Sequence, residues 1–461
     1  MLEFVKERGE NMNILVIGNG FDLAHELPTK YTDFLEVCRM IQSIYNIKNM
    51  NKNVEQHWEE LNIEVSYRRE ELQELFKELC QQRKIEQKIN EEDESVKEYI
   101  ITNTKWDEFS ECIGVPYSTN RWESIFRRKL NQLKGNWIDF EKEISLVIRE
   151  LEKEMWNFDD YEDMLDAKVI ELSDAFLAQR YIRNYSSDEK ATFRVIKKDL
   201  LKDLNRLTRA LEIYLCEFIS KIDIKIRIPD ISELEIDHVL SFNYTETYQK
   251  VYDEIWKPIV EYDYIHGKAD INNIIDTNNM VIGIDEYLPD EKKDVNVEFI
   301  EFKKFYQRVF KGNTQNAKDW CREIKSEAEY EKNSRMFMLE EQIKYELLDG
   351  IREDKELWRE FESRSRKYDE HYSRQHQKHN VYIFGHSLDV TDKDILRDLI
   401  LNDNVYTTIF FYSEDRSEKR ELGNKIANLT RIIGEDELIK RTAGEAKTIL
   451  FKMQREPICK K

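Results

Sequence analysis

The chain has 461 residues, of which 36% are charged, and its formal net charge is −21 at pH 7. Direct nucleic-acid binding is not expected, because a strong non-specific grip on a phosphate backbone needs a clustered cationic face. No apolar run approaches about 18 residues and no signal peptide is recognisable, so we expect a cytoplasmic protein without a membrane span. The six cysteines are scattered without a C-x-x-C pair, which argues against a structural zinc and against a disulfide framework.

Short apolar segments predict the strands of a sheet. Most of them are continuous apolar runs rather than alternating ones, which is typical of parallel strands buried on both faces. The predicted strands lie at about 13–17, 237–242, 261–265, 280–284, 380–385, 405–412 and 447–453.

Between the first and second of these segments lies a long block with helical spacing. The apolar stripes along 140–155 and 200–219 follow that spacing most clearly, and the stripe along 68–100 is weaker. A capping-box pattern predicts a short helix from Asp392 to Leu401, with Thr391 as its N-cap. We therefore predict an α/β fold in which one sheet is interrupted by two large helical insertions. Its core comprises residues 12–45, 230–295 and 376–461, and the insertions comprise 46–229 and 296–375.

The first predicted strand runs directly into a glycine-rich turn at Gly18 and Gly20. Glycines at such a turn let backbone N–H groups approach a phosphate at the positive end of the next helix. Leu23 stands where a complete dinucleotide fingerprint has its third glycine. The turn alone therefore leaves two interpretations open, a phosphate site and an ordinary tight turn.

The residues that follow resemble a known family. Residues 23–35 (Leu-Ala-His-Glu-Leu-Pro-Thr-Lys-Tyr-Thr-Asp-Phe-Leu) closely resemble the opening signature of the AbiH family of bacterial abortive-infection proteins. Segments 241–244 (Ser-Phe-Asn-Tyr), 265–267 (Ile-His-Gly) and 384–389 (Phe-Gly-His-Ser-Leu-Asp) resemble the later landmarks of that family, in the same order. The resemblance implies an effector that protects bacteria against phage.

The same segments are distantly similar to the sirtuin-like fold, which implies a parallel Rossmann-like sheet and NAD as the ligand. That similarity implies that Gly18 and Gly20 cradle the pyrophosphate. It also implies that Asn243 positions a ribose hydroxyl or the attacking water, and that His266 acts as the general base. Thr245 stands where sirtuins commonly carry an aspartate, which puts nicotinamide recognition in doubt. The zinc-binding cysteines of deacetylases are absent, so protein deacetylation is not expected.

Chain order places several of these residues after predicted strands, where ligands bind in open α/β sheets. We expect the catalytic candidates Asn243 and His266 to meet across one pocket beside the glycine turn. The structural alternatives are that Asn243 stabilises a turn, that His266 is a satisfied buried histidine, and that His386 braces a strand-to-helix turn. The candidate nucleotide-binding residues are Gly18, Asn19, Gly20, Phe21, Asp22, Asp285, Gly385, His386 and Ser387.

Three functional hypotheses follow. The first is an antiphage effector whose α/β core binds a nucleotide, with NAD as the expected ligand, and hydrolyses it. The second is a metal-dependent hydrolase or nuclease in which Asp22, Asp285, Asp389 and Asp392 hold Mg²⁺. The third is a non-catalytic sensor whose helical insertions recognise a phage product. The phage-derived trigger is left open, as is assembly into a homo-oligomer.

Overall fold

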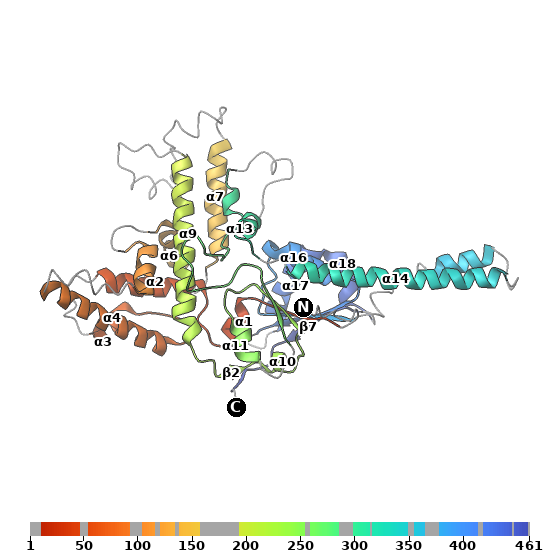
Figure 1. Ribbon diagram of the computed structural model, residues 1–461, viewed down its shortest axis with the longest axis horizontal. Coiled ribbons are helices and arrows are strands. Elements are labelled where there is room, and N and C mark those ends of the chain that lie inside the picture. Colours follow the sequence, from red (N-terminus) through yellow and green to blue (C-terminus); the bar gives the residue numbers. More distant parts are fainter. Residues whose placement is uncertain are drawn as a thin grey trace, which may run out of the picture.

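The computed structural model contains a parallel sheet surrounded by helices (Figure 1). The described residues are 11–46, 54–92, 104–115, 120–133, 138–156, 193–253, 259–284, 298–313, 316–348, 355–364, 378–413, 418–444 and 447–459.

Six strands form the sheet in the order β4-β3-β1-β5-β6-β7, and every neighbouring pair is parallel. Numbered within the sheet alone, this order is 3-2-1-4-5-6, so the direction of strand addition reverses between β1 and β5. Because all six strands are parallel, their carboxyl ends lie at one edge. The strands are β1 (Asn13–Ile17), β3 (His238–Ser241), β4 (Glu261–Tyr264), β5 (His379–Phe384), β6 (Val405–Phe411) and β7 (Ile449–Met453).

These six strands confirm six of the seven predicted segments, and the α/β class is confirmed with them. The prediction of a strand at 280–284 is wrong. Met280, Ile282 and Ile284 are buried in the apolar cluster that the helical block shares with one face of the sheet, and among the described residues an isolated bridge joins Ile284 to Lys303. An apolar run indicates burial, and this segment is buried without pairing as a strand of the sheet.

Alternate residues of the central strand bury opposite faces of the sheet. Ile14 and Val16 face α14, α16 and α17, whereas Leu15 and Ile17 face α1, α11 and the helical block. This period of two follows from strand geometry, and burial on both faces explains why the strand sequence shows no polar alternation. The helices that cover the sheet are α1 (Asn19–Ala24), α11 (Thr247–Tyr252), α14 (Asn316–Leu348), α16 (Lys393–Leu401) and α17 (Glu418–Ile433).

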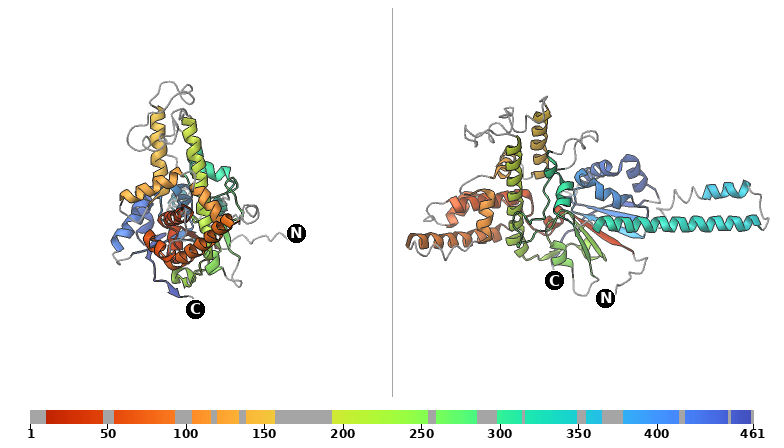
Figure 2. Two further views of the ribbon diagram at one scale, coloured as in Figure 1. Left: turned by 90° about the vertical axis from the view of Figure 1, so that its left-hand side faces the viewer. Right: turned by 45° about the horizontal axis from the view of Figure 1, so that its top comes forward.

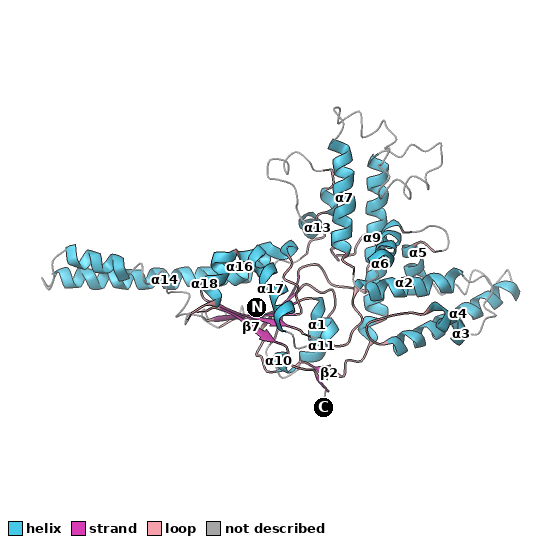
Figure 3. Cartoon of the chain, turned by 180° about the vertical axis from the view of Figure 1, so that it is seen from behind, coloured by secondary structure: helices cyan, strands magenta, loops and turns pink. Residues whose placement is uncertain are grey.

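The predicted helical block before β3 is present, and it lies beside the sheet (Figures 1 and 3). Trp58, Trp122, Phe126 and Phe140 are buried in it, and they belong to the same apolar cluster as Ile17 of the sheet. The block therefore shares a continuous core with the α/β part. Its helices are α2 (Tyr31–Asn46), α3 (Val54–Leu61), α4 (Arg69–Glu92), α5 (Lys105–Ile113), α6 (Arg121–Leu133), α7 (Phe140–Trp156) and α9 (Phe193–Glu217).

Helix α14 begins on the sheet, where Ala317, Trp320 and Ile324 are buried, and then continues well beyond it (Figure 2). A further helix at 355–364 lies along the projecting part (Figure 2). None of the helices in the described ranges combines the length and apolarity needed to cross a membrane. The remaining elements are η3 (Ile219–Lys221), β2 (Ile226–Arg227), α10 (Pro229–Ser232), η4 (Ile300–Phe302), α13 (Lys304–Phe310), η5 (Val390–Asp392), α18 (Glu435–Thr442) and β8 (Ile458–Cys459).

The loops after β1 and β5 cross at a close backbone contact. A Cβ on Gly20 would lie 2.8 Å from Cα of Gly385, and a Cβ on Gly18 would lie 2.8 Å from Cα of His386. Gly385 also has a φ of +68°, and a Cβ there would lie 2.1 Å from the backbone nitrogen of Phe21. The three glycines therefore permit the two central strand ends to meet.

We predict that Gly385→Ala lowers the free energy of unfolding by about 2–4 kcal/mol, because the methyl group adds left-handed strain to a clash with backbone atoms. Urea denaturation measures this change. The control is Gly423→Ala in α17, where nothing lies within 4 Å. That change should raise stability by about 0.5–1 kcal/mol. Equal stability of Gly385→Ala and the native protein would refute the close contact.

Candidate functional site

The carboxyl edge of the sheet brings several predicted site residues to neighbouring positions. Gly18 follows β1, Asn243 lies two residues after β3, His266 lies two residues after β4, and His386 lies two residues after β5. The parallel pairing of the four strands causes this arrangement, since it aligns their carboxyl ends. This edge is the candidate site.

One carboxylate lies at the middle of the edge. Asp392 Oδ1 is 3.2 Å from His266 Nε2, and Asp392 Oδ2 is 3.4 Å from His386 Nε2. The ammonium of Lys304 lies 3.6 Å from Oδ1, and the guanidinium of Arg308 lies 3.8 Å from it. All five residues are buried. We call these five residues, His266, Lys304, Arg308, His386 and Asp392, the strand-end centre.

The hydrogen bonds indicate where the histidine protons lie. His386 Nδ1 accepts the backbone N–H of Leu388 at 2.9 Å, so its neutral ring carries the proton on Nε2, toward Asp392. His266 presents Nε2 to the same carboxylate, so we assign its proton to Nε2 as well. Its Nδ1 is buried and has no hydrogen-bond partner among the described residues. A neutral His266 therefore holds an unused lone pair at Nδ1, which is the form a general base requires.

Burial and charge define the protonation states of the strand-end centre. Burial lowers the pKa of His266 to about 4, and the positive charge of Lys304 contributes to the same shift against the attraction of Asp392. Burial would raise the pKa of Asp392, but Lys304 and hydrogen bonds from His266 and His386 hold it well below the usual value. At neutral pH the centre thus contains a carboxylate, two cations and a neutral His266.

Asn243 belongs to a second group at the same edge. Its Nδ2 donates to the carbonyl of Gly18 at 3.0 Å, so the side chain braces the glycine turn. Asp22 lies beside it, accepts the hydroxyl of Thr245 at 2.7 Å through Oδ2, and has no partner for Oδ1 among the described residues. Burial raises the pKa of Asp22 to about 6, although the neighbouring polar side chains of Thr247, Thr245 and Asn243 oppose the shift.

The other predicted residues lie around these two groups. Asn19 is exposed and accepts the hydroxyl of Thr29, and Ser387 is exposed on the loop after β5. Phe21 is fully buried, with its ring 4.5 Å from that of His25 and 5.8 Å from that of Phe384. Its side chain is therefore part of the core. Asp285, also predicted for the site, lies outside the described residues.

Asp392 also corrects the predicted helix start. The predicted N-cap, Thr391, lies in η5, where Asp389 accepts its backbone N–H at 3.0 Å. The actual N-cap of α16 is Asp392, and its side chain makes no capping hydrogen bond. The prediction placed the cap one residue early. The carboxylate that a helix start would ordinarily use is turned toward the two histidines.

The described aspartates that the metal hypothesis assigned to a Mg²⁺ site do not lie close together. Asp22 contacts Thr245, Asp389 caps η5, and Asp392 is surrounded by imidazoles and cations. No group of three or more histidine, cysteine, aspartate or glutamate side chains is placed to hold a metal ion in the part of the chain that the structure describes.

Sequence reasoning missed the two cations of the strand-end centre, and it missed Glu141. Lys304 and Arg308 come from α13, and the ammonium of Lys304 also lies 2.7 Å from Oε2 of Glu141 in α7. Both insertions therefore supply side chains to the edge. The available signal was the sequence 303–310, in which Lys304 and Arg308 are one helical turn apart between aromatic residues.

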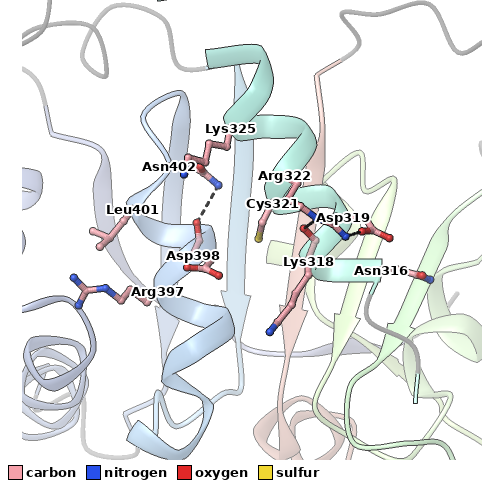
Figure 4. A pocket seen from close by; sticks show the side chains of 10 residues that line it. All are labelled: Asn316, Lys318, Asp319, Cys321, Arg322, Lys325, Arg397, Asp398, Leu401 and Asn402. Carbon is pink, nitrogen blue, oxygen red and sulfur yellow. Dashed lines mark hydrogen bonds and ion pairs between the residues drawn. The ribbon is translucent and has the colours of Figure 1, made fainter. Parts of the chain in front are cut away.

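A cavity of about 590 Å³ lies away from the centre, between α14 and α16 (Figure 4). Lys318 and Lys325 point from α14 toward α16, and Arg322 is paired with Asp319 on the opposite side of α14 (Figure 4). The cavity shares no residue with the strand-end centre, so its volume does not locate the chemistry. Its lining consists of Asn316, Lys318, Asp319, Cys321, Arg322, Lys325, Arg397, Asp398, Leu401 and Asn402.

A second cavity, of about 40 Å³, lies beside Asp22. Thr245 and Thr247 line it, and the hydroxyl of Thr247 donates to that of Thr245 at 3.1 Å. Thr245 in turn donates to Asp22, so two hydroxyls connect the cavity to the buried carboxyl group. Neither cavity is lined by Asn243 or His266. The predicted pocket shared by those two side chains is therefore not among these cavities.

Comparison with known proteins identifies one relationship. The family model described as "Bacteriophage abortive infection AbiH" matches residues 14–413, which include the glycine turn and the whole strand-end centre. No curated protein matches the chain, and no solved structure matches it.

We predict that Asp22→Asn stabilises the fold at neutral pH. Because the pKa of Asp22 is raised from 3.8 to about 6, its ionisation increasingly opposes folding as the pH rises through that range. The gain in free energy of unfolding should be near zero below about pH 4, grow between pH 4 and 6, and reach about 3 kcal/mol above pH 6.

Chemical denaturation of Asp22→Asn and the native protein between pH 4 and 8 tests this dependence. Asp276→Asn, on an exposed loop, is the matched control and should show no such growth with pH. A stability difference for Asp22→Asn that is independent of pH would contradict the buried carboxylate.

Proposed function

The chain belongs to the AbiH family of bacteriophage abortive-infection proteins, and from that premise we propose that its strand-end centre hydrolyses NAD to halt an infected cell. Family membership supports the abortive-infection role. The observation that carries the chemical proposal is Nδ1 of His266, which no described residue pairs and whose ring is held by Asp392 at the carboxyl edge of a parallel sheet.

The topology supports a nucleotide ligand. The order 3-2-1-4-5-6 is that of doubly wound dinucleotide-binding sheets, in which ligands bind outside the carboxyl ends where the order reverses. Here the reversal lies between β1 and β5. Gly18 directly follows β1, and His386 lies two residues after β5. The proposed ligand position is therefore the edge that carries the strand-end centre.

Two buried acceptors fit a ribose. Oδ1 of Asp22 and Nδ1 of His266 have no hydrogen-bond partner among the described residues, and a sugar offers hydroxyl donors for such atoms. Leaving a buried acceptor unpaired costs about 1–3 kcal/mol each. A ligand with several hydroxyl groups would relieve that cost, which favours a nucleotide over a purely apolar ligand.

In the proposed reaction, water attacks C1′ of the nicotinamide ribose while the glycosidic C–N bond breaks. Nicotinamide leaves with the electron pair of that bond, and the proton of the attacking water passes to Nδ1 of His266. The products are ADP-ribose and nicotinamide. Asp392 stabilises the imidazolium that forms, in the manner of an aspartate behind a catalytic histidine. Asn243 holds the glycine turn through Gly18 and so positions the ligand edge.

The first test measures nicotinamide release. Purified protein is incubated with NAD, with and without extracts of phage-infected cells, and the products are separated by chromatography. We predict that His266→Ala lowers the rate by about 10²–10⁴-fold, since general base catalysis contributes that much. Asp392→Asn should also lower it, because the imidazolium loses its counter-charge.

His57→Gln is the control, since its imidazole lies in α3 and contacts Ser43. Absence of nucleotide binding and of cleavage in every state would refute the mechanism. Full phage protection by His266→Ala and Asn243→Ala would instead favour the non-catalytic sensor. Activity lost in chelator would favour the metal-dependent hydrolase.

A further inference from the structure

Three backbone donors of the glycine turn are engaged within the protein. The N–H of Gly20 donates to the carbonyl of Gly385 at 2.8 Å, and the N–H of Phe21 donates to Gly18 at 2.8 Å. The N–H of Gly18 donates to Phe384 at 3.2 Å. A phosphate bound by these donors would have to break the contact that joins β1 to β5. The charges of a nucleotide need another partner at this edge.

Helix α13 brings cations to the same place. Lys304 and Arg308 are 3% and 7% exposed, are four residues apart on one face, and both approach Asp392. Nε of Arg308 is buried and has no hydrogen-bond partner among the described residues. A guanidinium presents its donors in a fixed fork that matches a phosphate, so an unused donor on a buried arginine points to an anionic ligand.

The amphipathicity of α13 is inverted, which argues that the two cations have a function. The helix buries Lys304, Gln307 and Arg308, and it exposes Val309 and Phe310 by 71% and 76%. Buried ion pairs seldom stabilise a fold relative to apolar residues, and exposed apolar side chains forgo about 1.5–3 kcal/mol each. A helix selected for stability alone would bury its apolar side chains and expose its cations.

The carboxylates that pair with the two cations differ in how deeply they are buried. Asp392 and the partly buried Glu141 contact Lys304, whereas Nη1 of Arg308 lies 3.5 Å from Asp394, whose side chain is 54% exposed. An exposed pair of this kind contributes about 0–1 kcal/mol, so an incoming anion can displace it at little cost. Asp394 therefore marks the solvent side of the cations.

We propose that Lys304 and Arg308 form an anion subsite that binds the phosphate groups of the ligand whose sugar reaches His266. The identity of the complete ligand rests on the proposed function. The binding of an anion rests on the geometry of α13. The glycine turn then serves to join β1 to β5, and α13 supplies the charge that the turn does not.

Calorimetric titration tests the subsite with three probes: NAD, inorganic pyrophosphate, and nicotinamide riboside, which carries no phosphate. Arg308→Gln should weaken binding of NAD and pyrophosphate by about 10–100-fold, because a charged hydrogen bond contributes about 1.5–3 kcal/mol. Binding of nicotinamide riboside should not change. Arg308→Lys should fall between Arg308→Gln and the native protein, since it keeps the charge without the fork.

Two further variants complete the experiment. Asp394→Asn, an exposed change that leaves the core intact, should tighten binding of pyrophosphate by about twofold to fivefold, because it removes a competing charge. Arg431→Gln on α17 is the matched control, because its exposed guanidinium contacts only Asn428 among the described residues, and it should leave all affinities unchanged.

The outcomes separate the subsite from the proposed reaction. If pyrophosphate binds through Arg308 but NAD is not cleaved, the subsite is supported and the proposed hydrolysis of NAD is refuted. NAD bound and cleaved equally by Arg308→Gln and the native protein overturns the subsite and leaves the reaction standing. Failure of the native protein to bind either phosphate-bearing probe, or unchanged pyrophosphate affinity in Asp394→Asn, also overturns the subsite.

Discussion

The carboxyl edge of the sheet depends on how the charge of one buried carboxylate is balanced. Asp392 is 6% exposed, and a carboxylate so far from water must have charged or hydrogen-bonding partners nearby. It finds them on three separate segments, through His266 after β4, His386 after β5 and the cations of α13. Satisfying this charge therefore holds the ends of two strands and an insertion in one place.

Several features of the same edge are costly to the fold, and their coincidence distinguishes it from the rest of the protein. Asp22 is buried with one oxygen that no described residue pairs, the same holds for Nδ1 of the buried His266, and α13 turns its charged face inward. A buried ionic group in the helical block, Arg209, is matched by contrast: it contacts both Glu108 and Glu212 at hydrogen-bond distance. Destabilising groups that gather where parallel strands end are typical of a functional site.

The strand-end candidates were predictable because strand geometry is local. Continuous apolar runs located β1, β3, β4, β5, β6 and β7, and the residues just after them include Gly18, Asn243, His266 and His386. The same rule failed at 280–284, where an apolar run is buried in the shared core without joining the sheet. It also missed Lys304 and Arg308, since a lysine and an arginine within a charged chain carry no local mark of burial.

The sequence by itself determined the α/β class, the family and the strand-end positions, because apolar periodicity and short motifs are local properties. Only the tertiary structure decided which side chains meet. Asn243 contacts Gly18, whereas His266 contacts Asp392, and 126 positions separate His266 from Asp392 in the sequence. Such pairings depend on how loops and insertions pack around the sheet. Contacts between residues far apart in the sequence leave no periodic pattern from which they could be predicted.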